Sequence, residues 1–246
     1  MRAISMKWLG VVGLLIVVAL AAVVRYQIGY PSVTVRYRLT LEAQVDGELK
    51  IASGVREVTY TKQPQLASQH ELSIGYRGEA IALDLGARGT LFALLKGGRD
   101  ERSGPEWIVL RAFDFDGGSL PRPVEVGVEQ VARLSGKREL PLDNLPMLVR
   151  FRDPNDVRTV EQVNPFNIGE RFGADAKLLR VTLEIVATGT PFSSSGMSGE
   201  PITTGIERKL AWWNGPFPWL KPTGGNVFID TRAETFKVNK EDFKIE

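Results

Sequence analysis

A run of residues without charge near the start of the chain is the feature that most constrains its fold. From Trp8 to Val24 there are 17 consecutive uncharged residues, and Lys7 and Arg25 bound them. In a helix, residues 8–26 would span roughly 27 Å, which is close to the hydrocarbon thickness of a bilayer. The sequence therefore predicts a cytoplasmic tail at residues 1–7 and a single transmembrane anchor at residues 8–26.

The ends of this segment suit a retained anchor. Trp8 and Tyr26 lie at the two ends of the segment, where aromatic side chains favour the membrane interface. Lys7, next to Trp8, and Arg25, next to Val24, can extend their charged groups to the lipid headgroups. The alternative is a signal peptide cleaved after Ala19-Leu20-Ala21, which would release a secreted protein. A short tail before one span favours translocation of the long C-terminal part. We therefore expect a bacterial cytoplasmic membrane protein whose residues from about 31 onward lie in the periplasm.

Composition excludes several classes of protein. The chain has 31 Lys and Arg against 29 Asp and Glu, and without Arg2 and Lys7 the basic total falls to 29, so the remainder is neutral. A neutral domain lacks the positive surface that nucleic acid binding needs. The chain has no Cys and one His, which excludes disulfides, thiolate metal sites and sites with two histidines.

The region of residues 31–140 has the pattern of β structure. Apolar side chains alternate with polar ones from Val35 to Val45, which predicts a half-buried strand. Asp46-Gly47 then supplies the residues of a tight hairpin turn. Leu49, Ile51 and Ser53 resume the alternation, and a bulge is expected at Ser53-Gly54.

Further strands are predicted from short apolar runs separated by glycines. These are Leu72–Tyr76, Ile81–Leu85, Thr90–Leu95 and Trp107–Phe113. Strands of this length and spacing are typical of a sandwich or an open barrel.

The region of residues 141–246 mixes strands and short helices, after prolines that indicate a boundary near residue 140. Before it, Val124–Leu134 reads as a helix or as a strand with a helical turn. Strands are predicted at Met147–Arg152 and Leu179–Ala187, and helical turns at Val157–Val163 and, with Asn164 as N-cap, at Pro165–Phe172. The fold class expected is β-rich α+β with antiparallel sheets, in two regions or packed as one domain.

The last part of the chain contains an unusual aromatic run, from Trp212 to Trp219. A capping box at Thr204 and Glu207 predicts a short helix whose apolar stripe ends at Trp213. The aromatic side chains then have three interpretations: a packed core, a protein interface or contact with the bilayer surface. The candidate interaction residues are Trp212, Phe217 and Trp219.

No motif for catalysis or metal binding is complete. Asp114-Phe115-Asp116-Gly117-Gly118 lacks the further oxygen ligands of a calcium loop, and Asp153-Pro154-Asn155-Asp156 is a turn sequence. Ser195-Gly196-Met197-Ser198-Gly199 has Glu200 where a nucleophile elbow needs glycine. His70 lies in a polar stretch. The sequence thus predicts no catalytic residues, no metal site and no cofactor.

A resemblance appears in the second region. Its pattern resembles a family of uncharacterised bacterial envelope proteins with an N-terminal hydrophobic segment. The residues that carry the resemblance are Leu145-Pro146, Phe151, Asp153-Pro154, Thr159-Val160, Val163-Asn164-Pro165, Phe172-Gly173 and Thr204-Gly205-Ile206-Glu207 through Leu210. Asn164-Pro165 stands where Asp-Pro is commoner in that pattern. The resemblance implies an envelope location and no particular activity.

These observations favour a membrane-anchored envelope protein with a non-catalytic accessory, scaffolding or assembly role through contacts with a protein partner. The alternative is an envelope protein that binds a lipid, a glycan or a small ligand. An enzyme is the third hypothesis.

Overall fold

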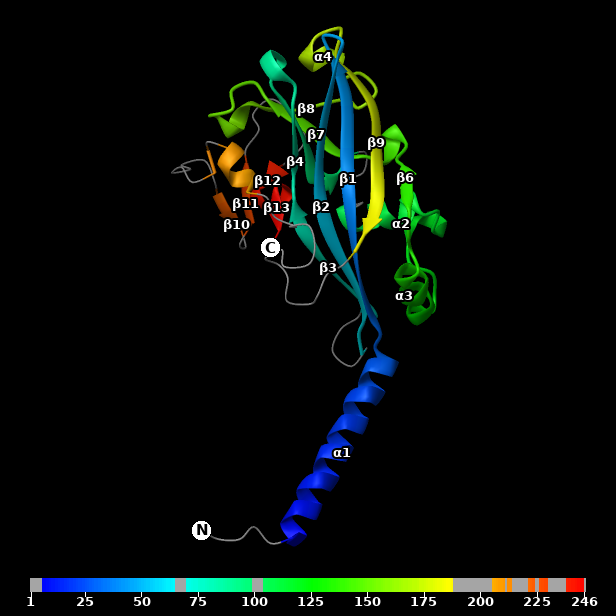
Figure 1. Ribbon diagram of the computed structural model, residues 1–246. Coiled ribbons are helices and arrows are strands. Elements are labelled where there is room, and N and C mark those ends of the chain that lie inside the picture. The colour runs from blue at the N-terminus through cyan, green and yellow to red at the C-terminus, as the bar shows by residue number, and fades with distance from the viewer. Residues whose placement is uncertain are drawn as a thin grey trace.

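The computed structural model describes residues 6–64, 70–98, 104–187, 205–210, 212–213, 221–223, 226–229 and 238–245. In this part of the chain the structure is β-rich, its sheets are antiparallel, and its helices are few and mostly short. Figure 1 shows the sheets at one end of the molecule and the apolar helix α1 projecting from them. The expected β-rich, antiparallel character is confirmed.

Helix α1 (Met6–Gly29) contains the uncharged segment. Its residues Val12–Gly29 have a mean hydropathy of 2.0 and none of them is buried, so the helix is apolar enough to cross a membrane or to serve as a signal anchor. The rings of Tyr26 and Tyr30 lie 5.0 Å apart at its C-terminal end. Only two residues separate α1 from the first strand.

The larger sheet has the strand order β13-β3-β2-β1-β9-β6. Strand β9 comes from the second predicted region but pairs with β1, so that Leu183 lies opposite Leu39. The two regions therefore share one sheet, and the prolines near residue 140 do not divide it. The strands are β1 (Ser32–Val45), β2 (Glu48–Lys62), β3 (Leu72–Glu79), β6 (Lys137–Glu139), β9 (Lys177–Val186) and β13 (Lys244–Ile245).

The β1–β2 hairpin forms at Asp46-Gly47, as predicted. Both residues have positive φ, 52° and 80°, which is the geometry of the preferred two-residue turn. The bulge expected at Ser53-Gly54 is wrong, because pairing with β1 is continuous there. Gly54 instead allows a close approach, since a Cβ atom at this position would lie 3.0 Å from Cγ1 of Ile81. The irregularity lies on the other side of β1, in its pairing with β9 at Glu42-Ala43.

A second sheet has the order β4-β5-β7-β8. Its central strand β5 is buried on both faces: Leu91 and Ala93 contribute to one apolar cluster, and Phe92 and Leu94 to another. This double burial explains the continuous apolar run in the sequence. The strands are β4 (Ile81–Asp84), β5 (Thr90–Gly97), β7 (Pro146–Phe151) and β8 (Val160–Gln162), and a small third sheet has β10 (Lys221–Thr223), β11 (Asn226–Ile229) and β12 (Val238–Asn239).

The strand predicted at Trp107–Phe113 is wrong. The segment forms the 3₁₀ turn η2 (Pro105–Trp107) followed by helix α2 (Ile108–Ala112). Four of the five residues of α2 are buried, and an apolar run this short does not distinguish a buried helix from a buried strand. Helix α3 (Val124–Ala132) confirms the helical alternative for its segment.

The two helical turns predicted after β7 are confirmed only in part. The 3₁₀ turn η5 (Val157–Thr159) forms, but strand β8 replaces the remainder of the first segment. In the second predicted segment, Pro165–Phe172, the side chain of Asn164 accepts the N–H of Phe166 at 3.0 Å and so caps a turn. The helix of this segment is α4, which covers only Gly169–Phe172. The other 3₁₀ turns are η1 (Gly86–Arg88), η3 (Asp116–Gly118), η4 (Leu142–Asn144), η6 (Ile206–Lys209) and η7 (Lys240–Asp242).

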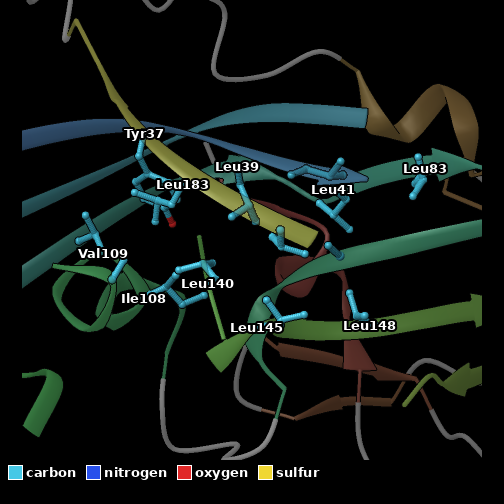
Figure 2. Packing of buried hydrophobic residues seen from close by; sticks show 14 of the residues in the cluster. Tyr37, Leu39, Leu41, Leu83, Ile108, Val109, Leu140, Leu145, Leu148 and Leu183 are labelled. Atoms are coloured by element: carbon cyan, nitrogen blue, oxygen red, sulfur yellow. The ribbon is translucent and has the colours of Figure 1, made fainter. Parts of the chain in front are cut away.

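The main core lies between the two larger sheets and α2. Figure 2 shows Leu39 and Leu183 of the larger sheet pointing toward the same interior as Leu140 and Leu145. The phenol of Tyr60 is also buried here and donates a hydrogen bond to the carbonyl of Glu106 at 2.5 Å. Burial raises the pKa of Tyr60 above its ordinary value, so the group stays neutral in this core.

A buried arginine links the two sheets. Arg56 of β2 is fully buried, and its Nη2 donates to the carbonyls of Ala93 at 2.9 Å and Leu94 at 3.1 Å. The pairing of β5 with β7 is irregular between Ala93 and Gly97, and the two carbonyls lie at the start of this irregular stretch. Gly78 leaves room for the arginine, because a Cβ atom there would lie 3.1 Å from Cγ of Arg56.

A second core covers the other face of β5 and β7. Trp212, 4% exposed, lies in it against Phe151 and Phe243, with ring centroids 5.7 and 5.4 Å from its own. Trp213, which the sequence placed on the apolar stripe, is only half-buried. The other buried members are Ala80, Phe92, Leu94, Met147, Val149, Val157, Val160, Ile206, Leu210 and Val238.

Candidate functional site

Part of strand β2 has a neighbour on one edge only. Strand β1 pairs with β2 along its whole length, from Glu48 to Thr61. Strand β3 pairs with the opposite edge only from Glu57 to Lys62. Past that point β3 no longer pairs with β2, and its last two residues pair with β13 along their other edge. Residues 48–56 therefore form an open strand edge within the described part of the chain.

The hairpin register determines which backbone groups face this open edge. Val45 and Glu48 flank the two-residue turn, where the hydrogen-bonded pairs of an antiparallel ladder begin, and such pairs then alternate with non-hydrogen-bonded ones. Leu49, Ile51 and Ser53 therefore direct N–H and C=O away from β1. Among the described residues, no backbone hydrogen bond outside the strand ladders involves these three.

A groove of about 420 Å³ runs beside the open edge. One wall is β2 from Leu49 to Val55, and the other is β4, itself the edge strand of the second sheet. Ile206 and Lys209 of η6 close one side. Figure 1 shows β2 and β4 beside each other, and Ile81 of β4 packs over Gly54, where a Cβ atom would lie 3.0 Å from its Cγ1, although the two strands do not pair.

Two exposed apolar side chains flank the groove. Leu49 is 55% exposed and Ile51 56%, although the alternation in the sequence suggested a buried face. The register explains the difference, because Lys50 and Ala52, not Leu49 and Ile51, lie opposite the inward-facing residues of β1. An open edge between exposed apolar residues is a ready template for another strand.

The charges of the groove are largely balanced. Nζ of Lys50 lies 2.7 Å from Oε2 of Glu48, and this hydrogen bond raises the pKa of Lys50 and lowers that of Glu48. Asp84 accepts the N–H of Gly86 at 2.8 Å. The groove thus has polar ends and no strong field of one sign, which suits an uncharged chain more than an ionic ligand.

The buried carboxylate of Glu79 holds the η6 wall in place. It accepts the N–H of Gly205 at 2.9 Å and that of Ile206 at 3.1 Å, and Nζ of Lys244 lies 3.8 Å away. The N-cap of η6 is Gly205, which makes no side-chain cap, so Glu79 of β3 supplies the acceptor that the sequence assigned to a capping box. Thr204 lies outside the described residues.

The aromatic residues proposed for interaction do not form this site. Trp212 is buried in the second core, so its assignment to an interaction surface is wrong. Its ring packs against those of Phe151 and Phe243 within that core. Phe217 and Trp219 lie outside the described residues. Of the anchor residues, Val24 and Tyr26 are exposed on α1, which also includes Trp8.

The carboxylates singled out in the sequence serve turns. Asp114 has φ 59° and precedes η3, and Asp153 accepts the N–H of Asn155 at 2.9 Å. No group of three His, Cys, Asp or Glu that could hold a metal ion occurs in the described ranges. His70 is exposed next to β3. The serine-rich segment at residues 193–198 lies outside the described part.

Comparison with known proteins gives no relative: no family model, no curated protein and no solved structure matches this chain.

Proposed function

We propose that this chain is a membrane-anchored protein with a non-catalytic accessory role, and that it binds an extended segment of a partner protein as an added strand at β2. The observation that carries the proposal is the open edge at Leu49, Ile51 and Ser53, which lies in a groove and is flanked by exposed apolar side chains. Strand addition uses main-chain hydrogen bonds for affinity and side-chain contacts for specificity.

The chemistry of the groove describes the partner segment. An added strand would place alternate side chains beside Leu49 and Ile51, so these should be apolar or β-branched. Proline is excluded opposite the edge donors because it removes an N–H. Each backbone hydrogen bond contributes about 1 kcal/mol net, so the apolar contacts must supply much of the affinity.

A second copy of this chain in the same membrane does not fit the edge in antiparallel pairing. The two-fold axis of an antiparallel β2–β2 pair is perpendicular to the strands. Figure 1 shows α1 leaving the end of the sheet opposite the β1–β2 turn, so such a pair would direct the two anchors in opposite directions. An added strand that pairs antiparallel with β2 should therefore come from a different protein.

Amide hydrogen exchange tests the open edge directly. In the full chain in lipid nanodiscs, the amides of Leu49, Ile51 and Ser53 should exchange faster than those of Lys50 and Ala52, since only the latter pair with β1. Peptides selected from a displayed library should slow exchange at the three edge amides. Equal protection along residues 49–53 in the free protein would show that the edge is already paired.

Variants of the edge test the binding mode. Ile51→Pro removes an edge N–H but no ladder bond to β1, and it should weaken the selected peptides by at least about tenfold. Leu179→Lys is the matched control, because Leu179 is similarly exposed on β9 and does not line the groove. The proposal is wrong if both variants bind equally well while both retain the wild-type melting temperature.

The proposed location is a bacterial cytoplasmic membrane, with α1 as a retained anchor and the sheets in the periplasm. The apolar helix and its position before β1 support this placement. A reporter that is active only in the periplasm should work when fused after Glu246, and a cytosolic reporter should not. The opposite pattern would reverse the topology, and a mature chain that begins near Ala22 would replace the anchor with a cleaved signal peptide.

A further inference from the structure

A larger cavity, of about 620 Å³, lies between β7, β8, η4 and α4. Its apolar part includes Leu145, Leu148 and Val163, which are buried members of the main core. It shares no lining residue with the groove beside β2. This volume is in the range of sites for small ligands, which typically combine apolar walls with a few well-placed polar groups.

An aromatic ring stands exposed on the cavity lining. Phe166 is 67% exposed, although a phenylalanine is normally among the most buried side chains. Its loop is held in place: Asn164 Oδ1 accepts the N–H of Phe166 at 3.0 Å, and the carbonyl of Asn164 accepts the N–H of Asn167 at 3.1 Å. The backbone that carries the ring is therefore held in a hydrogen-bonded turn beside the cavity.

Planar polar side chains complete the lining. Two amides, two carboxylates and one guanidinium are present: Gln162, Asn164, Asp143, Glu170 and Arg171. Several are oriented by neighbours. Gln162 donates to the carbonyl of Gly98 at 3.3 Å, Glu170 accepts from Nδ2 of Asn167 at 2.8 Å, and Nη1 of Arg171 lies 3.4 Å from Oε2 of Glu161.

This combination matches one chemical class of ligand. A pyranose ring has a face of C–H groups that stacks on an aromatic ring, and its edge carries hydroxyls that both donate and accept. Carboxylates accept from hydroxyls, guanidinium groups donate to them, and amides do both. The lining has two carboxylates and one guanidinium, so its net negative charge disfavours an anionic ligand. An acyl chain would offer no hydrogen-bond partner to the five polar side chains, so a lipid tail is disfavoured as well.

We propose that this cavity binds a short uncharged oligosaccharide, with a sugar ring stacked on Phe166 and its hydroxyls on the amide, carboxylate and guanidinium groups. The site is at the end of the molecule remote from the anchor. Strand β1 starts next to the anchor and has 14 residues, which is about 45 Å of extended chain. Figure 1 shows α4 near the end of β1 that is farther from the anchor. A ligand held there would be well separated from the bilayer surface.

The test uses the full chain in nanodiscs and a fixed set of probes. Cellobiose, maltotriose and diacetylchitobiose are titrated up to about 10 mM, with octanoate and inorganic phosphate as probes of the rejected classes. At least one saccharide should bind, and its protons should show magnetisation transfer from the protein. Binding of octanoate or phosphate with no saccharide binding would overturn the ligand class, and no binding by any probe would overturn the site.

Two variants locate the bound sugar. Phe166→Ala should weaken binding by at least about tenfold, whereas Phe166→Tyr should retain it because the ring face is kept. Leu179→Ala is the control, because this exposed side chain does not line the cavity. Equal affinity of Phe166→Ala and wild type would overturn the stacking geometry. Edge variants of β2 should leave sugar binding unchanged, so failure of this proposal and failure of strand addition are distinguishable.

Discussion

Replacement of Leu39 by Asp is expected to unfold the β domain. Leu39 is 0% exposed and lies opposite Leu183, which is equally buried. Figure 2 shows both side chains directed into the main core. An unpaired carboxylate at this place costs at least several kcal/mol in free energy of unfolding, comparable with the total stability of about 5–15 kcal/mol that a domain has. Circular dichroism and urea denaturation would measure the loss.

Gln44→Asp is the matched control for this prediction. Gln44 lies on the same strand, but its side chain is exposed and faces the outer side of the sheet. The same new charge should change the free energy of unfolding there by about 0.5 kcal/mol or less. A Leu39→Asp protein with wild-type denaturation would show that the inner face of β1 has been assigned incorrectly.

Truncation of Trp212 is the second change with a large expected effect. Trp212→Ala removes an indole that contacts Phe151 and Phe243, so it should lower the free energy of unfolding by about 3–5 kcal/mol. These contacts also join the end of β7 to the C-terminal turn. Denaturant unfolding followed by circular dichroism would give the free energy, with a lower midpoint at an unchanged slope.

Trp213→Ala provides the comparison. This ring is half-buried and lies 4.9 Å from Nζ of Lys240, while its carbonyl accepts from the same Nζ at 2.7 Å and would be retained in the variant. The loss should be about 1 kcal/mol, which is the scale of an exposed cation–π contact with some apolar burial. If Trp213→Ala costs more than Trp212→Ala, the two rings have been assigned to the wrong environments.

Local patterns accounted for the elements whose determinants are close in sequence. Asp46-Gly47 specifies a hairpin because these residues tolerate positive φ, and the alternation from Val35 to Val45 matches the inner face of β1. The two-residue turn also determines the face of every residue in β2. Counting from that turn places Leu49 and Ile51 outside, whereas their apolar character alone suggested the inside.

Elements that depend on distant contacts were predicted poorly. Helix α2 is buried in the main core, and the apolar run from Trp107 to Phe113 that contains it has no period that separates helix from strand. Buried Arg56 donates from Nη2 to two carbonyls of β5, and Gly78 leaves the space for its side chain. Neither partner is near Arg56 in sequence.

The same division applies to the candidate sites. Composition, the uncharged segment and the alternation of apolar residues were enough to indicate an apolar helix followed by a neutral, β-rich region, because hydropathy, charge and short-range periodicity are local properties of the sequence. Among the described residues, the open edge of β2 exists because its pairing with β3 stops at Glu57. The cavity beside Phe166 likewise forms where β7, β8 and α4 meet. The edge depends on where the pairing of β2 with β3 stops, and the cavity depends on how neighbouring elements pack in three dimensions. Neither follows from a local pattern in the sequence.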